Sequence, residues 1–155
     1  MKKNTKGSGL VEVVIVAAVL ATSTLAIFGT FALLSRLHQR NMLTIKAELL
    51  AEEGIEALRF LKGGGWGNLS GLSGGQAKYL SLGVSTWSTT ATPEVIDGAF
   101  YRTVHVNTVE RDSSDNIVSS GGTTDPNTLL IDSSVAWSWR GATTTVTYKA
   151  YITNI

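Results

Sequence analysis

The hydrophobic pattern begins with a long apolar run over residues 10–34, which is interrupted by one acid, Glu12. As a helix that rises about 1.5 Å per residue, the run is roughly 37 Å long. The hydrocarbon core of a bilayer is about 30 Å thick and needs about 20 apolar residues. The pattern therefore predicts a transmembrane helix over residues 10–34.

The charges on either side of this run bear on its orientation. Lys2, Lys3 and Lys6 precede it, and the positive-inside rule places them in the cytoplasm. Arg36 and Arg40 follow the run and oppose that orientation. Because the basic leader is short, we expect the N-terminus to stay in the cytoplasm and the long C-terminal part to be exported.

Between residues 36 and 62 the apolar positions recur at spacings of three and four, which marks one face of an amphipathic helix. These positions are Leu43, Ala47, Leu50, Gly54, Leu58 and Leu61. No breaker separates them from the apolar run, so one helix is predicted over residues 8–62, on the order of 80 Å long. The acidic residues that lie between these apolar positions indicate a solvated face of the helix rather than paired catalytic carboxylates.

Glycines at 63–65 end this helix and open a glycine-rich loop over residues 63–76. Beyond the loop, alternating apolar and polar residues predict antiparallel strands. They are expected at 77–82, 99–109, 128–139 and 143–153. The apolar side of such a sheet packs most simply on the part of the helix beyond the membrane, residues 36–62. We therefore expect an α+β fold, with the long N-terminal helix packed against an extracytoplasmic β domain over residues 77–155.

Composition narrows the possible functions. The 155 residues leave room for one domain beyond the membrane segment, and there is no cysteine for a disulfide or a thiol nucleophile. The 13 basic residues barely exceed the 12 acidic ones, so no nucleic-acid partner is expected. His38 and His105 lie on different predicted elements, and no Ser-His-Asp arrangement is evident. We expect no zinc site, no cofactor and no enzymatic activity.

The most specific motif lies where the leader meets the apolar run. Lys6 and Gly7 are followed by Ser8, and a cut after Gly7 would make Glu12 the fifth residue of the new chain. A carboxylate within an apolar segment costs about 2.5–3.5 kcal/mol on insertion scales and is functional by default. The alternative is a tolerated acid at the cytoplasmic edge of the membrane, where snorkelling lowers the cost.

This arrangement resembles the signature of type IV prepilins. The resemblance implies that residues 1–7 are a leader peptide, that a prepilin peptidase cuts between Gly7 and Ser8, and that Ser8 is N-methylated. It also implies that Glu12 acts in assembly. Ser8 stands where the family usually has phenylalanine, and no proline interrupts the helix. Both departures favour a minor pilin or a pseudopilin.

The resemblance further implies a structural subunit of a type IV pilus or of a type II secretion-like filament. Such a subunit starts in the inner membrane and ends in a cell-surface or periplasmic filament. Its expected partners are membrane lipid, the peptidase, other pilin-like subunits, an assembly platform protein and a cytoplasmic ATPase. The alternative is a singly anchored surface adhesin or binding module that does not polymerise.

Two further motifs point to other chemistry. Residues 72–76 spell LSGGQ, which resembles the signature motif of ABC-type ATPases. It lacks an accompanying P-loop and precedes a predicted strand, so we interpret it as chance composition. Asp112, Asp115, Asn116 and Asp125 offer oxygens for calcium, as in some pseudopilins. Their spacing does not match an EF-hand loop and suits plain turns, so no metal site is predicted and calcium stays an alternative.

Overall fold

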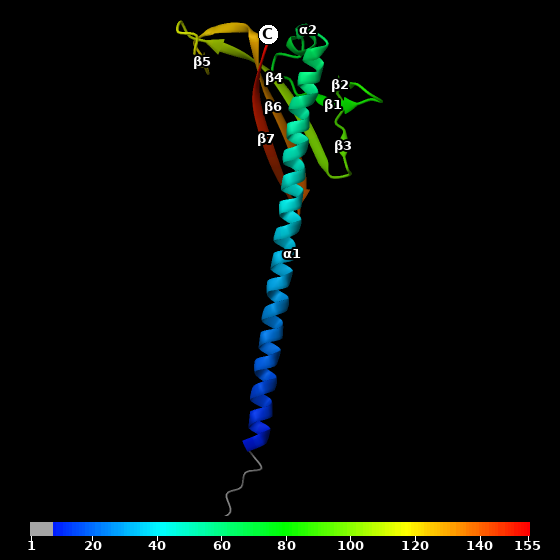
Figure 1. Ribbon diagram of the computed structural model, residues 1–155, viewed down its shortest axis with the longest axis vertical. Coiled ribbons are helices and arrows are strands. Elements are labelled where there is room, and N and C mark those ends of the chain that lie inside the picture. Colours follow the sequence, from blue (N-terminus) through cyan, green and yellow to red (C-terminus); the bar gives the residue numbers. More distant parts are fainter. Residues whose placement is uncertain (1–7) are drawn as a thin grey trace, which may run out of the picture. The chain divides into compact units, whose positions relative to one another are not determined.

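The computed structural model describes residues 8–155 and contains two helices and seven strands (Figure 1). The helices are α1 (Ser8–Gly63) and α2 (Trp66–Ser70). The strands are β1 (Tyr79–Leu82), β2 (Trp87–Thr90), β3 (Val95–Ile96), β4 (Phe100–Arg111), β5 (Ile117–Val118), β6 (Thr123–Trp139) and β7 (Ala142–Thr153). The chain divides into two compact units, Met1–Met42 and Leu43–Ile155, and α1 contributes residues to both.

The predicted helix over residues 8–62 is confirmed by α1. Within residues 8–155, α1 is the one helix long and apolar enough to cross a membrane, judged by length and composition. Three threonine hydroxyls in its apolar part donate to carbonyl oxygens four residues earlier, at 2.8–3.0 Å. These are Thr22, Thr24 and Thr30. Their polar groups are thus satisfied within the helix, which suits an apolar environment.

The C-terminal unit has the α+β fold predicted from the sequence. Its main sheet is antiparallel, with strand order β3-β4-β6-β7, and β5 pairs with the far end of β4. Residues 43–63 of α1 lie along one face of this sheet (Figure 1). A two-stranded sheet of β1 and β2 adds to the same core.

The alternation of apolar and polar positions predicted for the two central strands is confirmed by burial, although Trp139 at the end of β6 is only partly buried. The buried side chains are Phe100, Val104 and Val106 on β4, and Leu129, Ile131, Val135 and Trp137 on β6. On β7, Ile152 is buried, but Tyr148 stays 37% exposed although it pairs with buried Ser133. The reason is position, because β7 is an edge strand and its side chains have a neighbouring strand on one side only.

The helix and sheet lie close together at Gly54. A Cβ atom there would lie 2.3 Å from Ser133 Oγ and 3.1 Å from Arg102 Cδ. Ala51 and Ala47, one and two turns earlier, are also fully buried. Small residues on the inward side of α1 therefore set the short distance between helix and sheet.

Arg102 is a buried charge that the strand pattern did not predict. It occupies an inward position of β4, is 5% exposed, and its Nη1 donates to Glu53 Oε2 at 2.7 Å. The same nitrogen donates to the Leu50 carbonyl at 3.2 Å, and the guanidinium lies 5.1 Å from the Trp87 ring centroid. The buried cation is thus paired and hydrogen-bonded, as burial of a charge requires.

The structure also adds elements to the sequence prediction. The predicted loop over residues 63–76 contains α2, because Leu69 is fully buried and Trp66 Nε1 donates to the Pro126 carbonyl at 3.2 Å. Strands β2, β3 and β5 were not predicted, because they are two to four residues long and lack a clear alternation. β6 starts at Thr123 rather than at residue 128, since a shift of register after Thr108 lets pairing continue.

Candidate functional site

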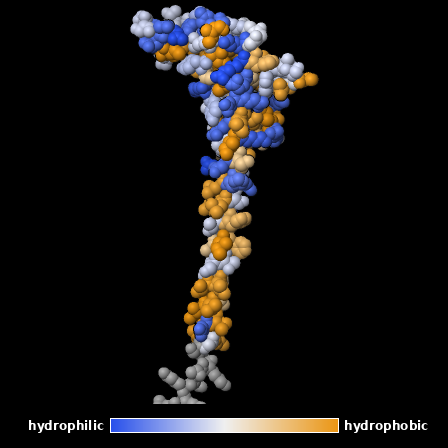
Figure 2. All heavy atoms as spheres, in the orientation of Figure 1, coloured by the Kyte–Doolittle hydropathy of each residue, from blue (hydrophilic) through white to orange (hydrophobic). Residues whose placement is uncertain are grey.

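The N-terminal part of α1 carries an extended apolar surface. Every large apolar side chain from Leu10 to Leu34 is at least 53% exposed. Figure 2 shows hydrophobic residues along this part of the helix. An exposed apolar surface of this extent marks an interaction site or a membrane segment. We call residues 10–34 the apolar segment.

Glu12 lies at the start of the apolar segment. Its neighbours along one side of the helix are Val13, Val16 and Leu20, and it is exposed. No described residue forms a hydrogen bond or an ion pair with its carboxylate. Ser8 is the first residue of α1, whereas Gly7 and the residues before it lie outside the described part of the chain. Among residues 8–155, therefore, the fold of one copy brings no partner to Glu12.

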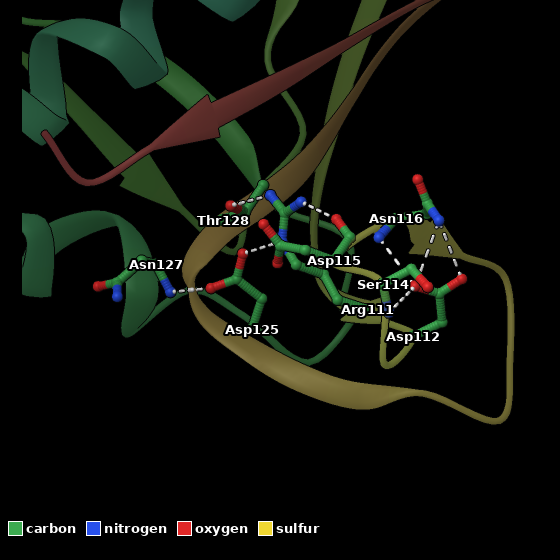
Figure 3. Close-up of polar contacts among 8 residues, drawn as sticks. All are labelled: Arg111, Asp112, Ser114, Asp115, Asn116, Asp125, Asn127 and Thr128. Carbon is green, nitrogen blue, oxygen red and sulfur yellow. Dashed lines mark hydrogen bonds and ion pairs between the residues drawn. The ribbon is translucent and has the colours of Figure 1, made fainter.

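A second cluster of polar side chains lies at the end of β4 and the start of β6 (Figure 3). Arg111 Nε donates to Asp125 Oδ2 at 2.7 Å, and its Nη2 donates to Thr128 Oγ1 at 3.3 Å. Its Nη1 donates to the Asp115 carbonyl at 2.8 Å. One guanidinium thus joins both strands to the loop that follows β4. We call this set the Arg111 cluster.

The loop after β4 is organised by Asp112. Its Oδ1 accepts hydrogen bonds from the backbone N–H groups of Ser114 at 2.8 Å and Asn116 at 2.9 Å. Asn116 Nδ2 also donates to Asp112 Oδ2 at 3.2 Å. These bonds stabilise the charged carboxylate and lower the pKa of Asp112. The Asp112 side chain therefore shapes a turn, as Asp does in Asx turns.

Three of the four residues considered for calcium, Asp112, Asp115 and Asp125, line one open hollow of about 860 Å³, and the fourth, Asn116, is hydrogen-bonded to Asp112. The structure uses them differently from a metal site. Asp125 is paired with Arg111, and Asn116 presents its amide nitrogen to Asp112. The positive guanidinium beside these oxygens opposes a second cation. Within residues 8–155 no group of three or more His, Cys, Asp or Glu side chains is placed to hold a metal ion.

The ion pair of Asp125 makes a prediction about acid stability. Hydrogen bonds from Thr128, from Arg111 and from the Asn127 N–H lower the pKa of Asp125 to about 2. An unfolded aspartate titrates near 3.9, so this group stabilises the fold above about pH 4, and the stabilisation is lost as pH falls towards 2. Asp125→Asn should therefore destabilise the C-terminal unit at pH 7 and cease to differ from the unmodified chain near pH 2.

Urea unfolding followed by circular dichroism at several pH values measures this difference. Asp115→Asn is the matched control, because the Asp115 side chain is 89% exposed and its carboxylate lies 3.7 Å from Arg111 Nε. A loss of stability at Asp125 that is independent of pH would contradict the ion-pair explanation.

The LSGGQ residues form part of the connection between α2 and β1. Gly74 and Gly75 have φ angles of 125° and 71°, and the Gly75 N–H donates to the Val106 carbonyl at 3.1 Å. The chain then enters β1, as predicted, and not the helix that follows this motif in ABC-type ATPases. His105 Nδ1 contacts the Gly75 carbonyl at 2.9 Å, while His38 is exposed on α1.

The geometry leaves two candidate sites, the apolar segment with Glu12 and the Arg111 cluster. Comparison of this chain with protein-family models, with curated proteins and with solved structures finds no match. Inference about function therefore starts from the residues and contacts described above.

Proposed function

We propose that this chain is a structural subunit, a minor pilin or pseudopilin, of a type IV pilus or a type II secretion-like filament. The observation that carries the proposal is the apolar segment, which is exposed on all sides and holds one acid, Glu12, close to the Gly7-Ser8 junction. Water solvates such a surface poorly. A bilayer suits it before assembly, and copies of the same helix suit it afterwards.

The composition of the apolar segment supports packing between helices. Small residues recur within it, among them Ala17, Ala21 and Gly29, and small residues let two helix backbones approach closely. Its threonine hydroxyls are bonded back to the helix backbone, so they leave no unsatisfied group in an apolar interface. A helix of this kind serves both as a membrane anchor and as one strand of a helical bundle.

The C-terminal unit supports the same role. Residues 43–63 of α1 supply one wall of its core, so a single helix is apolar in its first part and belongs to a folded domain in its second. In the proposed filament the apolar segments form the interior and the sheet domains form the exterior. The proposed partners are membrane lipid, a prepilin peptidase, other pilin-like subunits, a platform protein and a cytoplasmic ATPase.

Processing at the Gly7-Ser8 junction provides the direct test. The peptidase of this family requires a small residue before the cut, so Gly7→Leu should leave the precursor intact. Mass spectrometry of the unmodified chain, expressed with a prepilin peptidase, should find an N-terminus at Ser8 that carries one methyl group. An N-terminus still at Met1 under those conditions would sink the proposal.

The singly anchored adhesin or binding module remains the competing function. In that protein the leader would stay attached, and Glu12 would have no partner to meet. Replacing Glu12 would then ease insertion into the membrane and change nothing else. Blotting the sheared and membrane fractions of cells that carry Glu12→Ala distinguishes the two functions.

A further inference from the structure

Charged residues are sparse in the N-terminal part of α1, and their order is informative. Between residues 8 and 45 the sequence holds one acid, Glu12, and two strong bases, Arg36 and Arg40. Glu12 and Arg36 are both exposed on the helix. One chain therefore carries a negative charge at one end of the apolar segment and positive charge at the other.

These charges cannot meet within one copy. Glu12 and Arg36 are 24 residues apart, or roughly 36 Å along a straight helix, because each residue rises about 1.5 Å. They can meet between two parallel copies if one copy is displaced along its axis by that distance. The apolar segments then overlap little, so further copies at smaller displacements must fill the bundle, as in a filament.

The helix rotation favours Arg36 over Arg40 as the partner. At about 100° per residue, Arg36 lies about 240° around the helix from Glu12, and Arg40 lies about 280° around it. Two parallel copies related by sliding touch through opposite sides, about 180° apart. Arg36 therefore misses the ideal direction by about 60°, which its long side chain can span, and Arg40 misses it by about 100°.

We propose that Glu12 of one copy forms an ion pair with Arg36 of a second copy displaced by roughly 36 Å along the helix axis. This inference rests on the proposed function, because it needs copies that bundle through their apolar segments. The Glu12 carboxylate has two oxygens, so it accepts from the Ser8 amine of one neighbour and from Arg36 of another. The guanidinium suits this task because it binds carboxylates in a fixed geometry.

The ion pair offsets the free-energy cost of withdrawing these two charges from water. In a bundle, Glu12 and Arg36 are both withdrawn from water, and an unpaired charge in such a place costs several kcal/mol. Smaller displacements in the same direction leave Arg36 against the apolar side chains of its neighbours. The ion pair thus selects one long-range register among the many that apolar contacts alone would allow.

Disulfide trapping tests the register in a chain that has no cysteine of its own. Ile15 and Gln39 are also 24 residues apart, and Gln39 lies about 180° around the helix from Glu12, on the side that faces the partner copy. Ile15→Cys and Gln39→Cys, made in separate copies and co-expressed, therefore reproduce both the offset and the contact direction. Oxidised filaments should yield this heterodimer, whereas Ile15→Cys with Ser35→Cys should not. The two offsets differ by about 6 Å, and a disulfide tolerates Cα separations of only about 4.4–6.8 Å.

Charge variants provide the second measurement. Arg36→Gln should lower incorporation into sheared filaments by about tenfold, while Arg36→Lys and the matched Arg40→Gln should retain most of it. Normal incorporation of Arg36→Gln, together with no crosslink at the 24-residue offset, would overturn the inference and leave the proposed function standing. Failure of the unmodified chain to enter filaments would overturn both.

Discussion

Glu12→Ala is expected to be exported, cleaved and stable in the membrane, yet to be absent from filaments. The apolar segment becomes more apolar when the carboxylate is removed, so insertion gains by up to about 2.5–3.5 kcal/mol. In the proposed filament, assembly is weakened, because the Ser8 amine expected from cleavage and Arg36 of a displaced copy would then lack their counter-charge. Shearing filaments from cells and blotting the sheared and membrane fractions measures both effects.

Glu12→Asp is the matched control, since it keeps the charge and shortens the side chain by one methylene. It should enter filaments, with reduced efficiency, where Glu12→Ala does not. Equal incorporation of Glu12→Ala and the unmodified chain would remove the main reason to regard this protein as a pilin-like subunit with a working acid.

Trp137→Ala should destabilise the C-terminal unit by about 3–5 kcal/mol, the cost of truncating a large buried aromatic. The side chain is 3% exposed, and its ring centroid lies 6.1 Å from that of Phe100. It packs in a cluster with Ala47 and Ala51 of α1, so truncation opens a cavity between helix and sheet. Urea unfolding of a fragment covering Leu43–Ile155, which contains every residue of both core clusters, measures the change.

Trp137→Phe separates the loss of volume from the loss of the polar N–H group. The Trp137 Nε1 atom is buried and has no hydrogen-bond partner among the described residues. Phenylalanine fills most of the same space without burying a donor, and an unsatisfied buried donor costs about 1–3 kcal/mol. Trp137→Phe should therefore cost less than half as much as Trp137→Ala. A loss below about 1 kcal/mol for Trp137→Ala would contradict its role in the core.

The elements predicted correctly are those with a long hydrophobic period. Over residues 8–62 nothing interrupts helix formation, and the inward positions of β4 and β6 alternate over many residues, so burial follows from the pattern. Arg102 was missed because a charge at an inward position contradicts the simple rule. Its place between Phe100 and Val104 on the same side of β4 is the signal that a buried, paired cation was needed.

The two candidate sites differ in how far sequence reveals them. Gly7, Ser8 and Glu12 lie within six consecutive positions of the sequence, so they can be recognised together without knowledge of the fold. The Arg111 cluster depends on strand register, because Arg111 and Asp125 become neighbours only after the irregularity in the β4–β6 pairing that follows Thr108. The turn-like composition predicted loop positions for these acids, which is correct for Asp112 and Asp115, whereas Asp125 lies in β6 and pairs with the Arg111 guanidinium.

The order in which the core is completed has a consequence for biosynthesis. The inward side of α1 between Ala47 and Leu58 is translated first, whereas Ile152, which packs in the same core as Leu58, follows 94 residues after Leu58. Contacts of such long sequence separation form slowly and leave apolar surface open until β7 has been made. The nascent protein is therefore a substrate for chaperones and proteases until β7 joins the sheet, and a premature stop before β7 yields a helix whose inward side stays uncovered.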